Sequence, residues 1–501
     1  MNPSCRLPNG KGICGTANAA ACSRCAVAMD RRHFLRTTLG LGAGLLAGRP
    51  WNPVAGGDAP AQPRHPQVTI YVVYVGGAGA WPKPEFDAAA EKTKFERQLR
   101  EVERSFPEVR FVGGELTDSS AKVVEQVKAR PEVSGILCFH LGMRDITSIV
   151  NAGKPVVVFS QPFSGHEWML VSQLQQQGKA VALFSTRDLG EIGTAVSLLK
   201  AVGQMRQSKI LLAADRAGKR AQDIKTNVGC TIQEVTTEEL IAAHQAVPEE
   251  LARAEAEERW LKAARQIVEP NRAEIIKSAR MYWAMKQLLA ANQAQAIAVN
   301  CLGGIPIQTL GYPCLGFAQL CDEGLVGACE ADLDSTLTML LFSYAFKKPG
   351  FITDPLFDLS RNAVIHAHCV APTRMDGPGN ARAPFAIRTH RDDNRGASLE
   401  VDLRVGQAIS CARFMDDEAL LFSTGKIIEG KQAEFDDRGC RTQITVEVNG
   451  SAQKMLEDWS SAMRKYRDIR TLLHRVVFYG DHTRQVKHLA RLMALKVIAE
   501  C

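Results

Sequence analysis

The chain has 501 residues, of which 46% are hydrophobic and 23% charged, and its formal net charge is +7. These proportions are ordinary for a globular protein, and the length is sufficient for two or three domains. Part of the positive charge lies near the N-terminus, and no basic stripe with interleaved aromatic residues follows it. The composition therefore argues against a nucleic-acid-binding protein.

The N-terminal region has the pattern of an export signal. The sequence Arg-Arg-His-Phe-Leu over 31–35 is followed by a Gly/Ala-rich apolar run over 37–48. That run is too short for a membrane span, which needs about 20 apolar residues, but it fits a twin-arginine signal. The alternative is a chance arginine pair ahead of a helix. We predict a signal region over 1–65, export to the periplasm by the twin-arginine machinery, and a mature protein without a membrane partner.

The cysteines divide into two groups. Four precede the export signal, and the last two form a CxxC motif that could hold a metal or act as a redox pair: Cys5, Cys14, Cys22 and Cys25. Because they lie ahead of the signal, we expect them to be removed with it, and Met29 is a natural alternative start. The other ten of the 14 cysteines have no regular spacing, and we expect most of them to be buried thiols.

Strands and helices alternate along the segment 66–205. Short β-branched runs predict strands at 68–75, 109–112, 135–140, 155–160 and 180–184. Helical periodicity predicts helices at 92–105, 119–129, 143–152 and 189–205. This alternation predicts parallel strands with helices on both faces of the sheet.

The same alternation continues over 206–346. We predict strands at 209–214 and 296–300, a charged helical region at 248–264, and helices at 274–291 and 334–346. The segment therefore predicts a second doubly wound α/β domain.

The pattern changes after residue 347. Runs bounded by Gly or Asp turns predict strands at 363–370, 398–405, 408–414, 419–428, 442–448 and 475–479, with helices at 452–466 and 484–495. Such strands favour an antiparallel barrel. The predicted fold class is α/β, with two doubly wound domains followed by a β-rich, barrel-like C-terminal domain over 347–501.

Reactive side chains gather between residues 327 and 369. Glu330 comes just before the predicted helix at 334–346, and Asp354 precedes a proline, which favours an extended backbone. His366 and His368 alternate on one predicted strand and share a face. Two carboxylates with imidazole are the ligands of a divalent-metal site with open positions. The carboxylates could also move protons on a bound substrate.

Each of these residues also has a structural interpretation. Glu330 could balance the helix dipole, although Asp332 and Asp334 could fill that role. Asp354 could be a turn residue, and one strand histidine could belong to the core. His482 follows a predicted buried strand and precedes the last helix, a place where α/β proteins bind ligands.

The combined pattern resembles the L-fucose/L-arabinose isomerase fold family. The resemblance lies in Gly-Ala-Cys-Glu-Ala-Asp over 327–332, Thr-Asp-Pro over 353–355, a histidine-bearing strand, and Gly-Asp-His-Thr over 480–483. The segment 315–324 also resembles the one before the first acid. Family members have two α/β domains followed by a β-rich domain, which agrees with the predicted elements.

The resemblance also implies a metal site. Glu330 and Asp354 match the two acids, His482 matches the C-terminal histidine, and either His366 or His368 matches a strand histidine of the arabinose branch. The implied ion is most commonly Mn²⁺, with Mg²⁺, Co²⁺ and Zn²⁺ as alternatives. Folding before export would let the cell choose a weakly held ion.

The resemblance implies an aldose–ketose isomerase that uses a carboxylate pair and an enediol, with a small sugar as substrate and a homo-oligomeric assembly. Typical members are cytoplasmic, whereas this chain carries an export pattern. An exported protein meets glycans, so a lyase or hydrolase on the same fold is the alternative. A non-catalytic periplasmic sugar-binding protein is a third hypothesis.

Overall fold

The computed structural model describes residues 63–77, 81–214, 218–415, 417–431, 438–465 and 473–500. These residues all belong to one compact unit. The predicted export signal and the CxxC motif lie outside the described residues.

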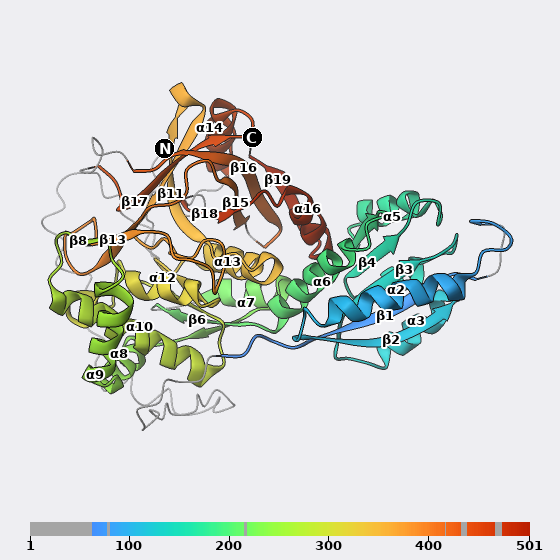
Figure 1. The fold of residues 1–501 in the computed structure, drawn as a ribbon, viewed down its shortest axis with the longest axis horizontal. Coiled ribbons are helices and arrows are strands. Elements are labelled where there is room, and N and C mark those ends of the chain that lie inside the picture. The colour runs from blue at the N-terminus through green and yellow to red at the C-terminus, as the bar shows by residue number, and fades with distance from the viewer. Residues whose placement is uncertain are drawn as a thin grey trace, which may run out of the picture. The chain divides into compact units, whose positions relative to one another are not determined.

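The first sheet is parallel throughout and has the order β2-β1-β3-β4-β5 (Figure 1). Its strands are β1 (Val68–Val75), β2 (Val109–Thr117), β3 (Val133–His140), β4 (Val156–Ser160) and β5 (Val181–Ser185). The helices are α2 (Ala88–Glu103), α3 (Ser120–Lys128), α4 (Thr147–Val150), α5 (Glu167–Gln176) and α6 (Glu191–Gln207). Every residue of β1 is buried, as expected for a strand inside a doubly wound sheet.

The second sheet is also parallel, with the order β10-β9-β6-β7. Its strands are β6 (Lys209–Ala213), β7 (Thr231–Glu234), β9 (Ala296–Val299) and β10 (Val326–Ala328). Its helices are α7 (Gly218–Asn227), α8 (Thr237–Ala246), α9 (Glu249–Glu255), the π-helix η1 (Ala256–Leu261), α10 (Arg272–Asn292), α11 (Ile307–Leu310), α12 (Cys314–Asp322) and α13 (Leu333–Phe346). A Cβ added at Gly327 would lie 2.6 Å from the Cα of Phe317, so glycine lets β10 pack closely on α12.

The C-terminal sheet closes into a six-stranded antiparallel barrel, with the order β15-β18-β11-β12-β17-β16 and a final pairing of β16 with β15. The barrel strands are β11 (Phe351–Asp358), β12 (Ala363–His368), β15 (Ala408–Met415), β16 (Ala419–Glu429), β17 (Thr442–Val448) and β18 (Arg475–Tyr479). β19 (Lys496–Ala499) adds to β16 in parallel, and η2 (Leu359–Arg361), α14 (Ala452–Lys465) and α16 (Thr483–Leu492) complete this part. The predicted fold class is therefore confirmed.

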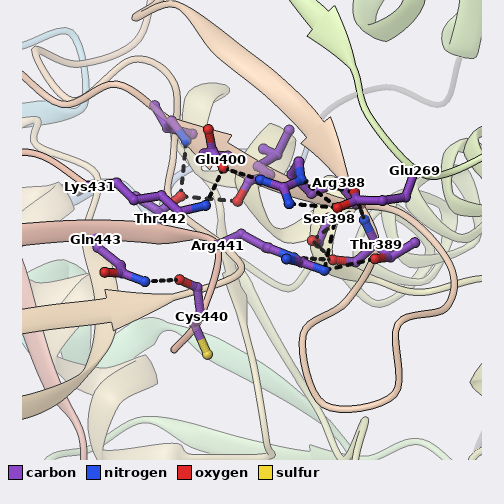
Figure 2. Close-up of polar contacts among 12 residues, drawn as sticks. Glu269, Arg388, Thr389, Ser398, Glu400, Lys431, Cys440, Arg441, Thr442 and Gln443 are labelled. Atoms are coloured by element: carbon purple, nitrogen blue, oxygen red, sulfur yellow. Dashed lines mark hydrogen bonds and ion pairs between the residues drawn. The ribbon is translucent and has the colours of Figure 1, made fainter. Parts of the chain in front are cut away.

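A small fourth sheet of three strands joins the segment after η1 to the segment between β12 and β15. β8 (Gln266–Ile267) pairs with β13 (Phe385–Arg388), which pairs with β14 (Ser398–Val401). Figure 2 shows the charges beside it: Arg388 donates to Glu269 at 2.6 Å and to Glu400 at 2.6 Å. Because Glu269 follows β8 and Glu400 lies on β14, this arginine connects the two edges of the small sheet.

None of the described helices combines the length and the apolar character needed to cross a bilayer.

Candidate metal centre

Four polar side chains meet at one end of the barrel: Glu330, Asp354, His368 and His474. Nε2 of His368 lies 3.5 Å from Oε1 of Glu330. Nε2 of His474 lies 3.5 Å from Oε2 of Glu330 and 3.4 Å from Oδ1 of Asp354. Potential ligand atoms of Asp354, His368 and His474 all lie within 4.8 Å of one another, as do those of Cys329, Glu330 and His368. We call the four side chains the metal cluster.

Three members of the metal cluster come from neighbouring barrel strands. Asp354 lies on β11, His368 ends β12, and His474 directly precedes β18, and these strands are adjacent in the order β18-β11-β12. β11 pairs with β18 only as far as Thr353, opposite Arg475. Beyond Thr353, β11 makes no ladder hydrogen bonds to β18, so the missing N–H of Pro355 removes none on that side of the strand.

Glu330 is placed by a tight turn between β10 and α13. The N–H of Asp332 donates to the carbonyl of Cys329 at 3.2 Å, which closes the turn. Both central residues are left-handed, with φ of 58° at Glu330 and 54° at Ala331. Positive φ at both central positions is characteristic of type I′ turns and normally favours Gly, Asn or Asp. A left-handed backbone costs an ordinary residue about 1–2 kcal/mol, so this turn is maintained against a local preference.

Asp332 fixes the orientation of His474. Its carboxylate caps α13 by accepting from Ser335 N at 3.0 Å. The same carboxylate accepts from Nη1 of Arg413, on β15, at 2.7 Å. It also accepts from Nδ1 of His474 at 2.8 Å. With Nδ1–H directed to Asp332, Nε2 faces Glu330 and Asp354, which is how a second carboxylate orients a metal-binding histidine.

The acidic groups and His474 favour one another's charged forms. Burial opposes the ionised form of Asp332, but Arg413 and His474 hold the pKa of that carboxyl well below its ordinary value. Burial also disfavours charged His474, yet contact with Asp332 and Asp354 raises its pKa to about 9. Burial opposes the ionised form of Asp354, but contact with His474 and the charge of His368 keep the pKa of that carboxyl below its ordinary value. Without an ion, the protonated imidazole therefore supplies the positive charge between the acids.

The donor set fits a divalent ion. Nε2 of His474 and Nε2 of His368 are buried, and neither has a hydrogen-bond partner among the described residues. Orphaned buried ring nitrogens facing carboxylates are expected where a cation belongs. His474 fits directly. His368 fits less well, because its Nδ1 accepts from the N–H of Cys369 at 2.9 Å, which leaves the proton of the neutral ring on Nε2.

Of the two strand histidines, the structure brings only His368 to the metal cluster. Oγ1 of Thr353 donates to the carbonyl of Arg475 at 3.0 Å and lies 2.8 Å from Nδ1 of His366, from which it therefore accepts. Burial and the charge of Arg475 lower the pKa of His366 to about 3. His366 is thus a neutral, satisfied core residue.

The structure does not bring His482, the predicted C-terminal ligand, to the metal cluster. Its ring stacks on Phe346 with centroids 4.2 Å apart, and its Nε2 donates to the carbonyl of Tyr479 at 3.1 Å. His474 and His482 flank opposite ends of β18, a strand of five residues, and such a strand is about 16 Å long. We expected the ligand after this strand, because parallel sheets bind ligands at the carboxyl ends of their strands. β11 pairs with Arg475 of β18 at Thr353 and with Ala367 of β12 at Asp354, so the start of β18 and the end of β12 lie level with each other across β11. The feature of the sequence that could have pointed to His474 is its place directly before a predicted buried strand.

A cavity of about 440 Å³ reaches Cys301, although none of the four cluster residues lines it. Its wall includes Cys301, Tyr312, His390, Asp392 and Asp393. Sγ of Cys301 lies 3.1 Å from Sγ of Cys329, the residue before Glu330. The volume falls within the usual range for small-molecule sites.

No family model matches the chain. Among curated proteins it is similar to sulfoquinovose isomerase of Priestia megaterium, with 21% identity over 281 residues, which cover 55% of this chain and 59% of the relative. The sulfoquinovose isomerase of Alkalicoccus urumqiensis is 24% identical over 252 residues, covering 48% and 54%. That of a Clostridium species is 23% identical over 228 residues, covering 43% and 46%. The chain thus matches less than two thirds of the length of these relatives. Their names support a distant relationship with a family of sugar isomerases.

Proposed function

We propose that this protein is a divalent-metal-dependent sugar isomerase that interconverts an aldose and a ketose. The observation that carries the proposal is the convergence of Glu330, Asp354 and two histidines at one end of the barrel. The distant relatives named sulfoquinovose isomerase support the same reaction class.

Glu330, Asp354 and His474 would hold the ion, with His368 as a fourth ligand if its ring turns or its proton moves to Nδ1, so that an unprotonated nitrogen faces the ion. Two carboxylates and imidazole suit Mn²⁺, and Mg²⁺, Co²⁺ or Zn²⁺ would compete for the same atoms. A bound divalent ion would act as a Lewis acid, making the proton on the carbon next to a sugar carbonyl more acidic.

The chain's own groups would move the protons. The side chains of Glu330 and Asp354 keep 23% and 35% exposure, so both carboxylates can reach a substrate. In the aldose-to-ketose direction, one carboxylate removes the proton from C2, and the C1–C2 double bond of an enediol forms. The other carboxylate delivers a proton to C1 while the hydroxyl proton at C2 moves to the oxygen at C1. Asp332 would keep the His474 ring in one orientation throughout.

Turnover of a sugar panel in deuterated water tests the proposal. The Mn²⁺-loaded protein is incubated with neutral aldoses, a sulfonated aldose and aryl glycosides, and the products are followed by NMR. We expect ketose carrying deuterium at C1, and no such product with Glu330→Gln. Release of an aglycone would instead favour a glycan lyase or hydrolase. Tight sugar binding without turnover, unaffected by chelation, would favour a binding protein.

A further inference from the structure

Two cysteines lie at the ends of neighbouring strands beside the metal cluster. Cys301 follows β9 and Cys329 follows β10, and these strands are parallel, with Ala298 opposite Ala328. The ladder continues past the strands, because the N–H of Ala331 donates to the carbonyl of Val299 at 3.0 Å. The backbone thus holds the two thiols in a fixed relation.

The two sulfur atoms are already in contact. Sγ of Cys301 lies 3.1 Å from Sγ of Cys329, and both residues are buried, with exposures of 5% and 2%. A disulfide has an S–S distance of about 2.05 Å, so the sulfurs need to approach by only about 1 Å. Side-chain rotation can supply such a shift while the paired strand ends stay in place.

A reagent can reach one of the two thiols. Cys301 forms part of the wall of the 440 Å³ cavity, together with Leu302, Tyr312 and His390. Cys329 lies behind it and precedes Glu330 in the strained turn. An oxidant small enough to enter the cavity would therefore meet Cys301 first.

We propose that Cys301 and Cys329 are a dithiol–disulfide site, oxidised by peroxide that enters through the cavity, which links the turn carrying Glu330 to the end of β9. Peroxide oxygen transfers to the sulfur of Cys301, giving a sulfenic acid and releasing one water. The sulfur of Cys329 then attacks that sulfur, the S–S bond forms, and the second water leaves. Two thiols and one hydrogen peroxide thus give one disulfide and two waters, with two electrons passing from the thiols to the peroxide. This site does not depend on which reaction the metal cluster performs.

Non-reducing peptide mapping tests the proposal. The purified full-length protein is treated with hydrogen peroxide, remaining thiols are blocked with N-ethylmaleimide, and the chain is cleaved after glutamate. Glu323 lies between Cys301 and Cys329, so the cut separates them unless a disulfide joins the fragments. We expect a linked pair that gains two blocked thiols on reduction, with the bond assigned to Cys301 and Cys329 by fragmentation.

Two single variants make the assignment independent of the wild-type map. Cys314 lies on the same side of Glu323 as Cys301 and is the matched control. Cys314→Ser should keep the linked fragments, and Cys301→Ser should lose them. If Cys301→Ser does not fold, Cys329→Ser serves as the second test. Unlinked fragments in the wild type, or a link that survives Cys301→Ser or Cys329→Ser, would overturn the proposal.

Discussion

His474 and Asp332 form a hydrogen-bonded pair, with Nδ1 of the histidine 2.8 Å from Oδ2 of the aspartate. The pair connects the N-terminus of α13, which Asp332 caps, to the start of β18, which His474 precedes. It therefore links the part of the chain that carries Glu330 to the barrel strands that carry Asp354 and His368.

We predict that Asp332→Asn weakens metal binding without removing any proposed ligand. The amide keeps the size of the side chain but no longer accepts a charge-assisted bond from His474, and losses of this kind typically cost 10–100-fold in metal affinity. Titration of the metal-free protein with Mn²⁺ measures the effect. Asp334→Asn is the matched control, since Asp334 approaches Arg413 and Arg220 rather than His474. Equal losses in both variants would show that a general charge effect, not the orientation of His474, governs binding.

The two histidines of the metal cluster should differ in importance. Nε2 of His474 faces the acids and can bind an ion once it gives up its proton, whereas Nδ1 of His368 accepts from the N–H of Cys369 and leaves the proton of the neutral ring on Nε2. We expect His474→Ala to reduce Mn²⁺ affinity by at least tenfold more than His368→Ala, as measured by calorimetric titration. The opposite ranking would mean that the ring of His368 turns, or its proton shifts to Nδ1, readily when an ion binds.

The turn that carries Glu330 should store strain that glycine can release. Ala331 has a φ of 54°, and replacing it with glycine removes the left-handed penalty of about 1–2 kcal/mol at the expense of a more flexible unfolded chain. We predict that Ala331→Gly stabilises the protein by about 0.5–1 kcal/mol in urea unfolding. Ala328→Gly, within β10, should instead destabilise it. A loss of stability in Ala331→Gly would show that neighbouring contacts, rather than the turn itself, set this backbone conformation.

Removal of the ion should lower both activity and stability. A chelator should abolish turnover, and added Mn²⁺ should restore it. An ion present at 100 times its dissociation constant stabilises the folded state by about 2.7 kcal/mol, so the thermal midpoint should rise when Mn²⁺ is added. Glu330→Gln should lack most of this Mn²⁺-dependent shift. Full turnover in the presence of chelator would contradict metal dependence.

Much of the fold could be predicted because the hydrophobic pattern determines it locally. β1 spans Val68–Val75, as predicted, since a run of apolar, β-branched and aromatic residues leaves little choice of structure. The helix that begins at Leu333 and the barrel strands 408–415 and 442–448 also follow the predicted pattern closely. Elements without such a pattern were missed. β7, for example, has four residues, none of them buried.

The candidate site was predictable only in part. Glu330, Asp354 and His368 lie within a short stretch of chain, and the structure brings them together. His474 enters because the barrel closes β18 against β11, a pairing across more than a hundred residues that local pattern does not reveal. The choice between His366 and His368 depended on Thr353, whose hydroxyl is already bonded to His366.

Anomalous X-ray scattering from crystals containing Mn²⁺ tests the central claim most directly. The account predicts one strong manganese peak per chain, within coordinating distance of Glu330, Asp354 and His474. The absence of a peak at these side chains, or a peak beside His482 instead, would contradict it.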